Sequence, residues 1–139
     1  MGVVKLDDKS FDAFVKGNES VVVDCYADWC MPCRMVSPIV DELSEEMDGT
    51  AFAKLNVDYS QNVAMRYGIM SIPTILFFRN GELADMAIGA MPKAMLKRKL
   101  FIRDKRVWQS VRVLSKRVAS LLYPKYQGES SNLLISTSK

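Results

Sequence analysis

Short apolar runs alternate with amphipathic stretches along the first hundred residues. The runs are rich in β-branched residues and are bounded by turn residues, which is typical of strands. They predict strands at residues 3–6, 21–26, 51–57, 74–78 and 83–88. Between them, apolar residues recur every three or four positions and predict helices that begin near residues 7, 32, 61 and 92. The alternation predicts an α/β fold.

The predicted sheet is mixed, with four to five strands and helices on both faces. The run at 21–26 is apolar at nearly every position, as expected of an interior strand covered by helices. Asn80-Gly81 favours a two-residue hairpin, so the last two strands should be antiparallel. Asp24 and Lys54 are charged side chains within otherwise apolar strands. Asp24 is either a buried functional carboxyl or a surface carboxylate at a strand end, and Lys54 either a functional residue or an edge charge.

Two cysteines lie where the strand at 21–26 gives way to the next helix. In the run Trp29-Cys30-Met31-Pro32-Cys33, two residues separate the cysteines, so both lie within one helical turn. They are close enough to form a disulfide or to share a metal. Unpaired N–H groups and the helix dipole stabilise a thiolate at a helix start, which favours redox chemistry.

A zinc site and a pair of inert core thiols are the alternatives for these cysteines. Zinc usually takes four ligands, whereas the chain has three cysteines and no histidine. An odd number of cysteines also suits a redox pair plus one buried, inert thiol, Cys25. The residues thus favour a redox pair over a metal site.

Residues 1–103 resemble the thioredoxin family in several motifs that follow one another in the family's order. The motifs are Val23-Asp24, Ala27-Asp28-Trp29-Cys30, Pro32-Cys33, Pro38, Ser71-Ile72-Pro73-Thr74, Asn80-Gly81 and Gly89-Ala90. Met31 stands where the usual form of the family has glycine. The resemblance implies a thioredoxin fold for residues 1–103, which we expect to form one thioredoxin domain. It also implies no bound cofactor, only a redox-active disulfide between Cys30 and Cys33.

The resemblance implies a role for each residue near the cysteine pair. Cys30 should attack a target disulfide, because the first cysteine of such a pair is the more exposed one and lies nearest the helix start. Cys33 then attacks the mixed disulfide and releases the reduced target. Asp24 is the candidate base for Cys33, since burial raises the pKa of a carboxyl toward neutral pH. Lys54 matches the family's buried lysine and would partner Asp24.

An apolar docking rim around the cysteines is also implied by the resemblance. Its predicted members are Trp29, Met31, Pro32, Ile72, Pro73, Gly89 and Ala90. The bond between Ile72 and Pro73 should be cis, and its turn should lie against the disulfide. Met31, Met70 and Ser71 depart from the family's commonest residues, which leaves the redox potential and the choice of partner open.

The end of the chain differs in charge from the rest. Residues 1–100 carry eleven Lys/Arg and fourteen Asp/Glu, whereas residues 101–139 carry eight and two. Residues 104–122 are predicted to extend a basic amphipathic helix, and the Ser-rich end to form a flexible tail. This extension, residues 104–139, would pack on the domain or on its copy in a homodimer, contact an anionic membrane or nucleic acid, or be dispensable. A nucleic-acid partner is not expected.

The sequence also bears on location. No run approaches the roughly 18 apolar residues of a membrane span, and the first residues lack the apolar core of a secretory signal. A reducing, cytoplasmic setting is the expectation.

Taken with the resemblance, these features predict a thiol–disulfide oxidoreductase. It would reduce disulfide-containing protein substrates and be re-reduced by a thioredoxin reductase. One alternative is a disulfide oxidase or isomerase of similar fold, which Met31 permits. The other is a non-catalytic, thioredoxin-like binding module in which the cysteines serve docking alone.

Overall fold

The computed structural model describes residues 2–103 of the 139-residue chain. Its elements are β1 (Val4–Leu6), α1 (Phe11–Lys16), β2 (Ser20–Tyr26), α2 (Met31–Glu46), β3 (Ala51–Asn56), α3 (Gln61–Arg66), β4 (Thr74–Arg79), β5 (Glu82–Ile88) and α4 (Lys93–Arg103). The strands and α1 to α3 belong to one compact unit, Met1–Lys93, whereas α4 from Ala94 onward belongs to another. The predicted extension, residues 104–139, lies outside the described residues.

The five strands form one mixed sheet in the order β1-β3-β2-β4-β5. β3 pairs in parallel with both β1 and β2, whereas β4 pairs antiparallel with β2 and β5. The hairpin between β4 and β5 turns at Asn80 and Gly81, which have φ angles of 51° and 83°. These positive values are the ones a type I′ turn requires, and Asn-Gly adopts them readily. The predicted mixed sheet and its hairpin are confirmed.

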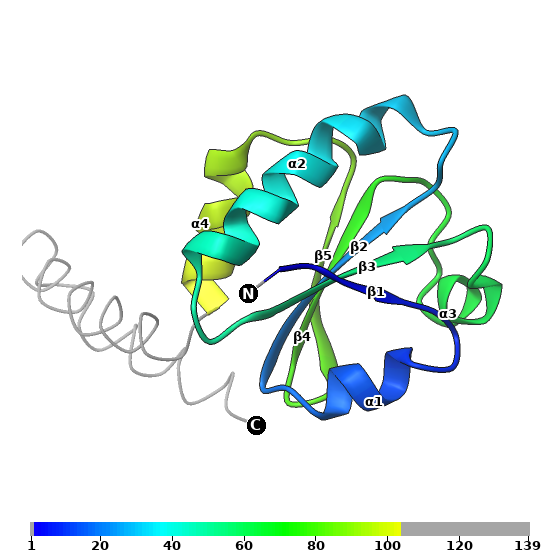
Figure 1. Cartoon of the computed structure of the whole chain (residues 1–139), viewed down its shortest axis with the longest axis horizontal. Coiled ribbons are helices and arrows are strands. Elements are labelled where there is room, and N and C mark those ends of the chain that lie inside the picture. Colours follow the sequence, from blue (N-terminus) through cyan, green and yellow to red (C-terminus); the bar gives the residue numbers. More distant parts are fainter. Residues whose placement is uncertain (1, 104–139) are drawn as a thin grey trace, which may run out of the picture. The chain divides into compact units, whose positions relative to one another are not determined.

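Figure 1 shows α1 and α3 on one side of the sheet and α2 on the other. Phe11, Val15 and Val63 from α1 and α3 are buried in one core cluster with alternate residues of the strands, including Val23 and Leu76. The ring of Phe11 also lies 5.6 Å from each of the rings of Tyr67 and Phe78. Alternate residues of each strand point to opposite faces, so the remaining strand residues face α2.

The long helix α2 follows its predicted amphipathic pattern. Val36, Val40 and Leu43, spaced three or four residues apart, are buried, and Pro38 lies inside the helix as expected. The exposed side carries acidic residues, and Lys93 bonds to two of them, Glu42 at 2.9 Å and Glu46. One face of α2 thus covers the sheet, and the other faces water.

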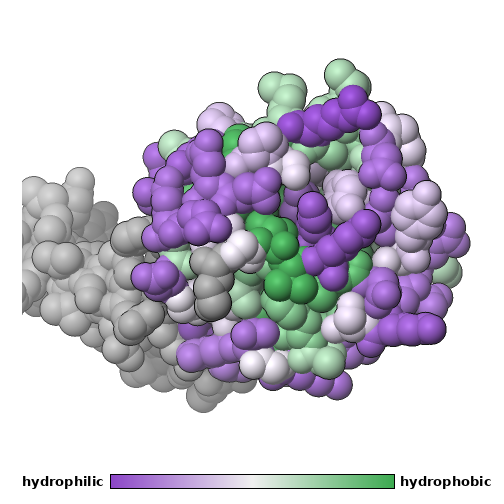
Figure 2. All heavy atoms as spheres, viewed as in Figure 1, coloured by the Kyte–Doolittle hydropathy of each residue, from purple (hydrophilic) through white to green (hydrophobic). Residues whose placement is uncertain are grey.

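The face of the described residues seen in Figure 2 is largely polar. Figure 2 shows hydrophilic residues over most of one face, with an apolar area near the centre of the view, over the sheet.

Among the helices within residues 2–103, none has the length and apolar character needed to cross a bilayer. In α4, taken by itself, Leu96 and Leu100 are buried and lie four residues apart on one helix face.

Candidate active site

A disulfide joins Cys30 and Cys33 at the start of α2, with their Cα atoms 5.3 Å apart. β2 ends at Tyr26, four residues before Cys30, so the cysteine pair lies just beyond the carboxyl end of this strand. Cys30 is the N-cap of α2 with an extended backbone, and its Sγ accepts a hydrogen bond of 3.2 Å from the backbone N–H of Cys33. Pro32 lies in the first turn, where its missing N–H would have no helical partner in any case.

This helix start stabilises negative charge on Cys30 once the disulfide is reduced. The N–H groups of the first helical turn have no carbonyl partners within the helix, and the dipole places a partial positive charge there. The N–H of Cys33 already points at the Cys30 sulfur. Cys30 is 3% exposed and Cys33 is 2% exposed, so the expected greater exposure of Cys30 is hardly visible in the disulfide form. The hydrogen bond, rather than exposure, distinguishes Cys30.

Asp24 is buried within β2, on the face of the sheet that α2 covers. Its neighbours Val23 and Cys25 belong to the core cluster under α1 and α3, so Asp24 points the other way. Its side chain is 1% exposed, and its Oδ1 has no hydrogen-bond partner among the described residues. Asp24 is therefore a buried carboxyl, as predicted, and not a surface carboxylate at a strand end.

Burial is the main reason why the pKa of Asp24 rises from about 3.8 to about 7. The negative charge of Asp41 raises this pKa further, and the positive charge of Lys54 lowers it by a smaller amount. Lys54 is the register partner of Asp24 on the parallel strand β3 and is half-buried. The structure thus brings the two predicted charged residues side by side, and Asp24 can exchange a proton near neutral pH.

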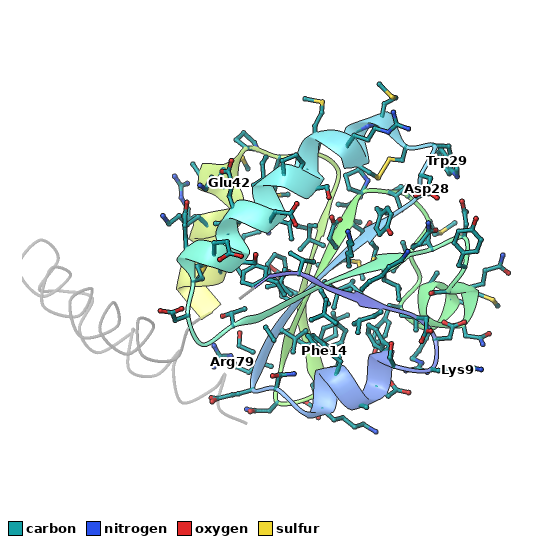
Figure 3. All side chains as sticks on the ribbon, viewed as in Figure 1. Lys9, Phe14, Asp28, Trp29, Glu42 and Arg79 are labelled. Carbon is teal, nitrogen blue, oxygen red and sulfur yellow. A yellow bond between two sulfur atoms is a disulfide. The ribbon has the colours of Figure 1, made fainter. Side chains whose placement is uncertain are left out.

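Trp29 lies beside the disulfide and is exposed rather than packed in the core. Its side chain is 69% exposed, and its Nε1 donates a hydrogen bond of 2.9 Å to Oδ2 of Asp58. Figure 3 shows Trp29 and Asp28 at the same end of the sheet as the sulfur–sulfur bond. Sequence reasoning missed Asp58, which follows β3 and fixes the orientation of the indole.

An open groove of about 450 Å³ runs along the disulfide. Four residues of the predicted rim line it, namely Trp29, Met31, Pro32 and Ile72. The remaining lining residues, apart from Cys30, are Val57, Ile69, Met70 and Ser71. The sequence analysis also missed Val57 as a groove residue, although the strand pattern could have indicated it. It follows a strand parallel to β2, and the carboxyl ends of parallel strands meet at one edge of a sheet.

The loop before β4 completes this end of the molecule. The bond between Ile72 and Pro73 is cis, as predicted. Ile72 packs against the small cluster of Ala27, Cys30 and Cys33, so the turn lies against the disulfide. The carbonyl of Pro73 accepts a hydrogen bond of 2.8 Å from the N–H of Gly89. Pro73, Gly89 and Ala90 are not lining residues of the groove, although this bond ties Gly89 to the loop.

The third cysteine, Cys25, has no access to this chemistry. It is a free thiol, buried in the core cluster under α1 and α3. Burial raises its thiol pKa far above the usual range, and the charge of Asp24 adds to the shift.

Within residues 2–103, no group of three or more His, Cys, Asp or Glu side chains converges to hold a metal.

The sequence model of the family described as Thioredoxin matches residues 2–101. A chloroplastic M-type thioredoxin of Pisum sativum is 54% identical over 97 residues, and a thioredoxin of Synechocystis is 47% identical over 94. The match to the pea protein covers 68% of this chain and 56% of the pea protein. The match to the Synechocystis protein covers 66% of this chain and 88% of that protein. The chain thus spans little more than half the length of the pea relative.

Solved structures agree with this likeness. A mutant thioredoxin from Halobacterium salinarum superimposes with a TM-score of 0.67 at 35% identity, over 70% of this chain and 86% of that one. A thioredoxin from Plasmodium falciparum gives 0.70 at 31% identity, over 73% of this chain and 100% of the other.

Proposed function

The chain belongs to the thioredoxin family, and we propose that it reduces protein disulfides as a dithiol–disulfide oxidoreductase. The observation that carries the proposal is the Cys30–Cys33 pair at the start of α2, with the Cys33 N–H donated to the Cys30 sulfur. A thiolate is the reactive form in disulfide exchange, and this arrangement stabilises a thiolate on Cys30. Thioredoxins act without a bound cofactor, and the cysteine pair itself carries the two electrons.

In the first step, the Cys30 thiolate attacks one sulfur of a target disulfide. A new bond forms between Cys30 and that sulfur, the target disulfide breaks, and the other target cysteine leaves as a thiolate that takes a proton from water. The groove lined by Trp29 and Ile72 is where we propose that the target chain docks. Its apolar lining suits an extended segment with apolar side chains next to the reacting cysteine.

In the second step, Cys33 loses its proton and attacks Cys30. The mixed disulfide breaks, the reduced target leaves, and the Cys30–Cys33 disulfide forms, so two electrons have passed to the target. We propose Asp24 as the acceptor of the Cys33 proton, because its pKa of about 7 lets it bind a proton near neutral pH. Lys54 would tune that pKa through its opposing charge.

The cycle closes when an external donor reduces the disulfide again. A thioredoxin reductase is the donor that membership of the family suggests, and disulfide-containing proteins are the substrates. The pea and rice relatives are described as chloroplastic M-type or M5 thioredoxins. They do not confirm the expected cytoplasmic location, which stays a prediction that fractionation of cells expressing the tagged chain would test.

The reduction of insulin by dithiothreitol tests the proposal, with Cys30→Ser as the test variant and Cys25→Ala as the control. We expect the catalysed rate of insulin reduction to fall by at least about a thousandfold in Cys30→Ser, because the attacking sulfur is gone. Cys25→Ala should keep a kcat/KM within about twofold of the wild type, because Cys25 is sealed in the core. Equal rates for Cys30→Ser and the wild type would refute the proposal, and equal rates no faster than that of dithiothreitol alone would favour a binding module.

The exposed Met31 between the two cysteines permits a second candidate, a disulfide oxidase or isomerase. Titration of the pair against a glutathione series separates the candidates, because reductants of this fold lie near −270 mV and oxidants near −120 mV. A potential close to about −270 mV would favour the reductase.

A further inference from the structure

Methionine is the commonest exposed large apolar residue around the cysteine pair. Met70 is 96% exposed, and Met31, placed between the two cysteines, is 66% exposed. Both line the groove beside the disulfide. Met70 also lines a neighbouring groove of about 310 Å³ along α3, together with the exposed Met65. Thioether sulfurs therefore stand in solvent at the place where a target chain would dock.

We propose that Met31 and Met70 are sites of reversible oxidation by peroxides, and that their sulfoxides weaken the docking of protein disulfides in this groove. The inference rests on the proposed function, since it concerns the same groove. In the reaction, the thioether sulfur attacks one oxygen of the peroxide, the O–O bond breaks and an S–O bond forms. The sulfur loses two electrons and keeps that oxygen. The second oxygen of hydrogen peroxide leaves as hydroxide, which takes the proton from the oxygen on sulfur and becomes water.

Access to solvent makes these two side chains reactive toward peroxide, whereas the cysteines are shielded in the disulfide form. Cys30 and Cys33 are joined to each other and buried, so neither has a free thiolate for peroxide to attack. Met31 and Met70 are neither buried nor shielded in that form. Peroxide thus modifies exposed methionines, including the two in the groove, and leaves the disulfide intact.

Oxidation at these places changes the groove because, apart from Ser71, the rest of its lining is largely apolar. Val57, Ile69 and Ile72 lie along the same surface. A sulfoxide is polar, and an apolar target chain that covers it must remove its water without offering a hydrogen bond in return. A small soluble disulfide, which reacts at Cys30 without covering the groove, does not meet this cost. Methionine sulfoxide reductases reverse the modification.

Met35 offers a matched control within the same helix. It is 71% exposed, close to the value for Met31, and lies four residues later on α2. It is absent from the lining of both methionine-bearing grooves in the described part of the chain. Peroxide should therefore oxidise Met35 as well, without any effect on docking.

The test treats the full chain, in its disulfide form, with hydrogen peroxide, then removes the peroxide and maps sulfoxides by peptide mass spectrometry. Each sample is then assayed for insulin reduction and for reduction of a small aromatic disulfide. We expect sulfoxide at Met31 and Met70, a loss of about fivefold to tenfold in kcat/KM for insulin, and a small-disulfide rate within about twofold of the untreated value. Treatment with methionine sulfoxide reductases A and B should restore the insulin rate.

Variants locate the effect, each compared with its own untreated sample. The double variant Met31→Leu/Met70→Leu keeps apolar side chains that peroxide does not oxidise, so its insulin rate should survive treatment. Met35→Leu should lose activity on treatment as the wild type does. An undiminished insulin rate in oxidised wild type, or an equal loss in the double variant, would overturn the inference. An untreated wild type that fails to reduce insulin at all would instead overturn the proposed function.

Discussion

Asp24 places a polar group with an unbonded oxygen inside the sheet, which destabilises the fold. Its burial raises the pKa of the carboxyl to about 7 from about 3.8. At low pH the acid is neutral in both the folded and the unfolded chain. Above pH 7 the folded chain must hold a buried negative charge, whereas the unfolded chain holds the same charge in water.

The first prediction follows for Asp24→Asn. The folded pKa lies above the unfolded one, so the wild type loses stability as the pH rises from about 4 to about 7, by roughly 4 kcal/mol in total. Asparagine has no such titration. The stability of Asp24→Asn relative to the wild type should therefore increase by roughly that amount between pH 4 and pH 8, measured by urea unfolding of the disulfide form.

The exposed carboxyl of Asp48 provides the control for this measurement. Asp48→Asn should follow the wild type within about 0.5 kcal/mol at both pH values. A stability difference between Asp24→Asn and the wild type that is the same at pH 4 and pH 8 would contradict the account of Asp24.

The second prediction concerns the turnover of the same variant. If Asp24 takes the proton of Cys33, Asp24→Asn should reduce insulin about tenfold or more slowly at pH 7, because general bases commonly contribute a hundredfold or more. The wild-type rate should also fall below pH 7 as Asp24 becomes protonated, and the variant should lack that step. Identical pH profiles for the two proteins, from pH 5 to pH 9, would remove Asp24 from the mechanism.

Among single residues, the sequence allows prediction of those site residues whose evidence lies in their neighbours along the chain. Cys30 and Cys33 could be recognised from their spacing and the helix that follows, and Asp24 from its apolar neighbours. Asp58, which holds the Trp29 indole, lies 29 residues away. Finding it required the pairing of β2 with β3, which the local pattern does not specify.

Among the helices, α3 owes its start to a distant residue. It has only six residues, and the side chain of its N-cap, Ser60, makes no capping hydrogen bond. Instead, Oδ1 of Asp8 accepts a hydrogen bond of 3.0 Å from the N–H of Val63, and Oδ2 accepts one of 3.4 Å from that of Asn62. A carboxylate also suits the positive end of the helix dipole.

The third prediction is that Asp8→Ala destabilises the protein by about 1–2 kcal/mol, the usual cost of losing a cap. The fall in the free energy of unfolding should appear in urea unfolding at pH 7, and Asp48→Ala, at an exposed site, is the comparison. An unchanged midpoint for Asp8→Ala would mean that the cap contributes nothing.

The elements themselves were largely predictable because their apolar periodicity is strong. The helix predicted to begin near residue 61 is observed at Gln61–Arg66, and the strand predicted at 83–88 is observed at Glu82–Ile88. The helix predicted to begin at Asp7 begins at Phe11, since Asp7 and Ser10 instead bond to each other in the turn before it. Such turn bonds compete with helix formation and shift a boundary by a few residues.

For the whole molecule, the candidate machinery lies within one compact unit. Asp24, Lys54, the cysteine pair and the groove all belong to Met1–Lys93. Apolar periodicity predicted a mixed sheet but not the strand order β1-β3-β2-β4-β5, which depends on contacts across the chain. The domain boundary after residue 103 and the roles of residues 104–139 stay predictions.

The fourth prediction is that residues 104–139 are not needed for disulfide reduction. A chain truncated after Arg103 should keep kcat/KM for insulin within about twofold of the full chain. Far-UV circular dichroism and urea unfolding establish that the truncated chain is folded. Loss of most activity in a folded truncated chain would show that the extension takes part.

The central claim is that Cys30 attacks the target and Cys33 resolves the mixed disulfide. The most direct test is Cys33→Ser, which should stop the reaction at the first covalent step. Reduced Cys33→Ser, mixed with disulfide-bonded insulin, should form a covalent adduct that dithiothreitol cleaves. Peptide mapping of the adduct should place the bond at Cys30. An adduct through Cys25, or no adduct under conditions where the wild type reduces insulin, would contradict the account.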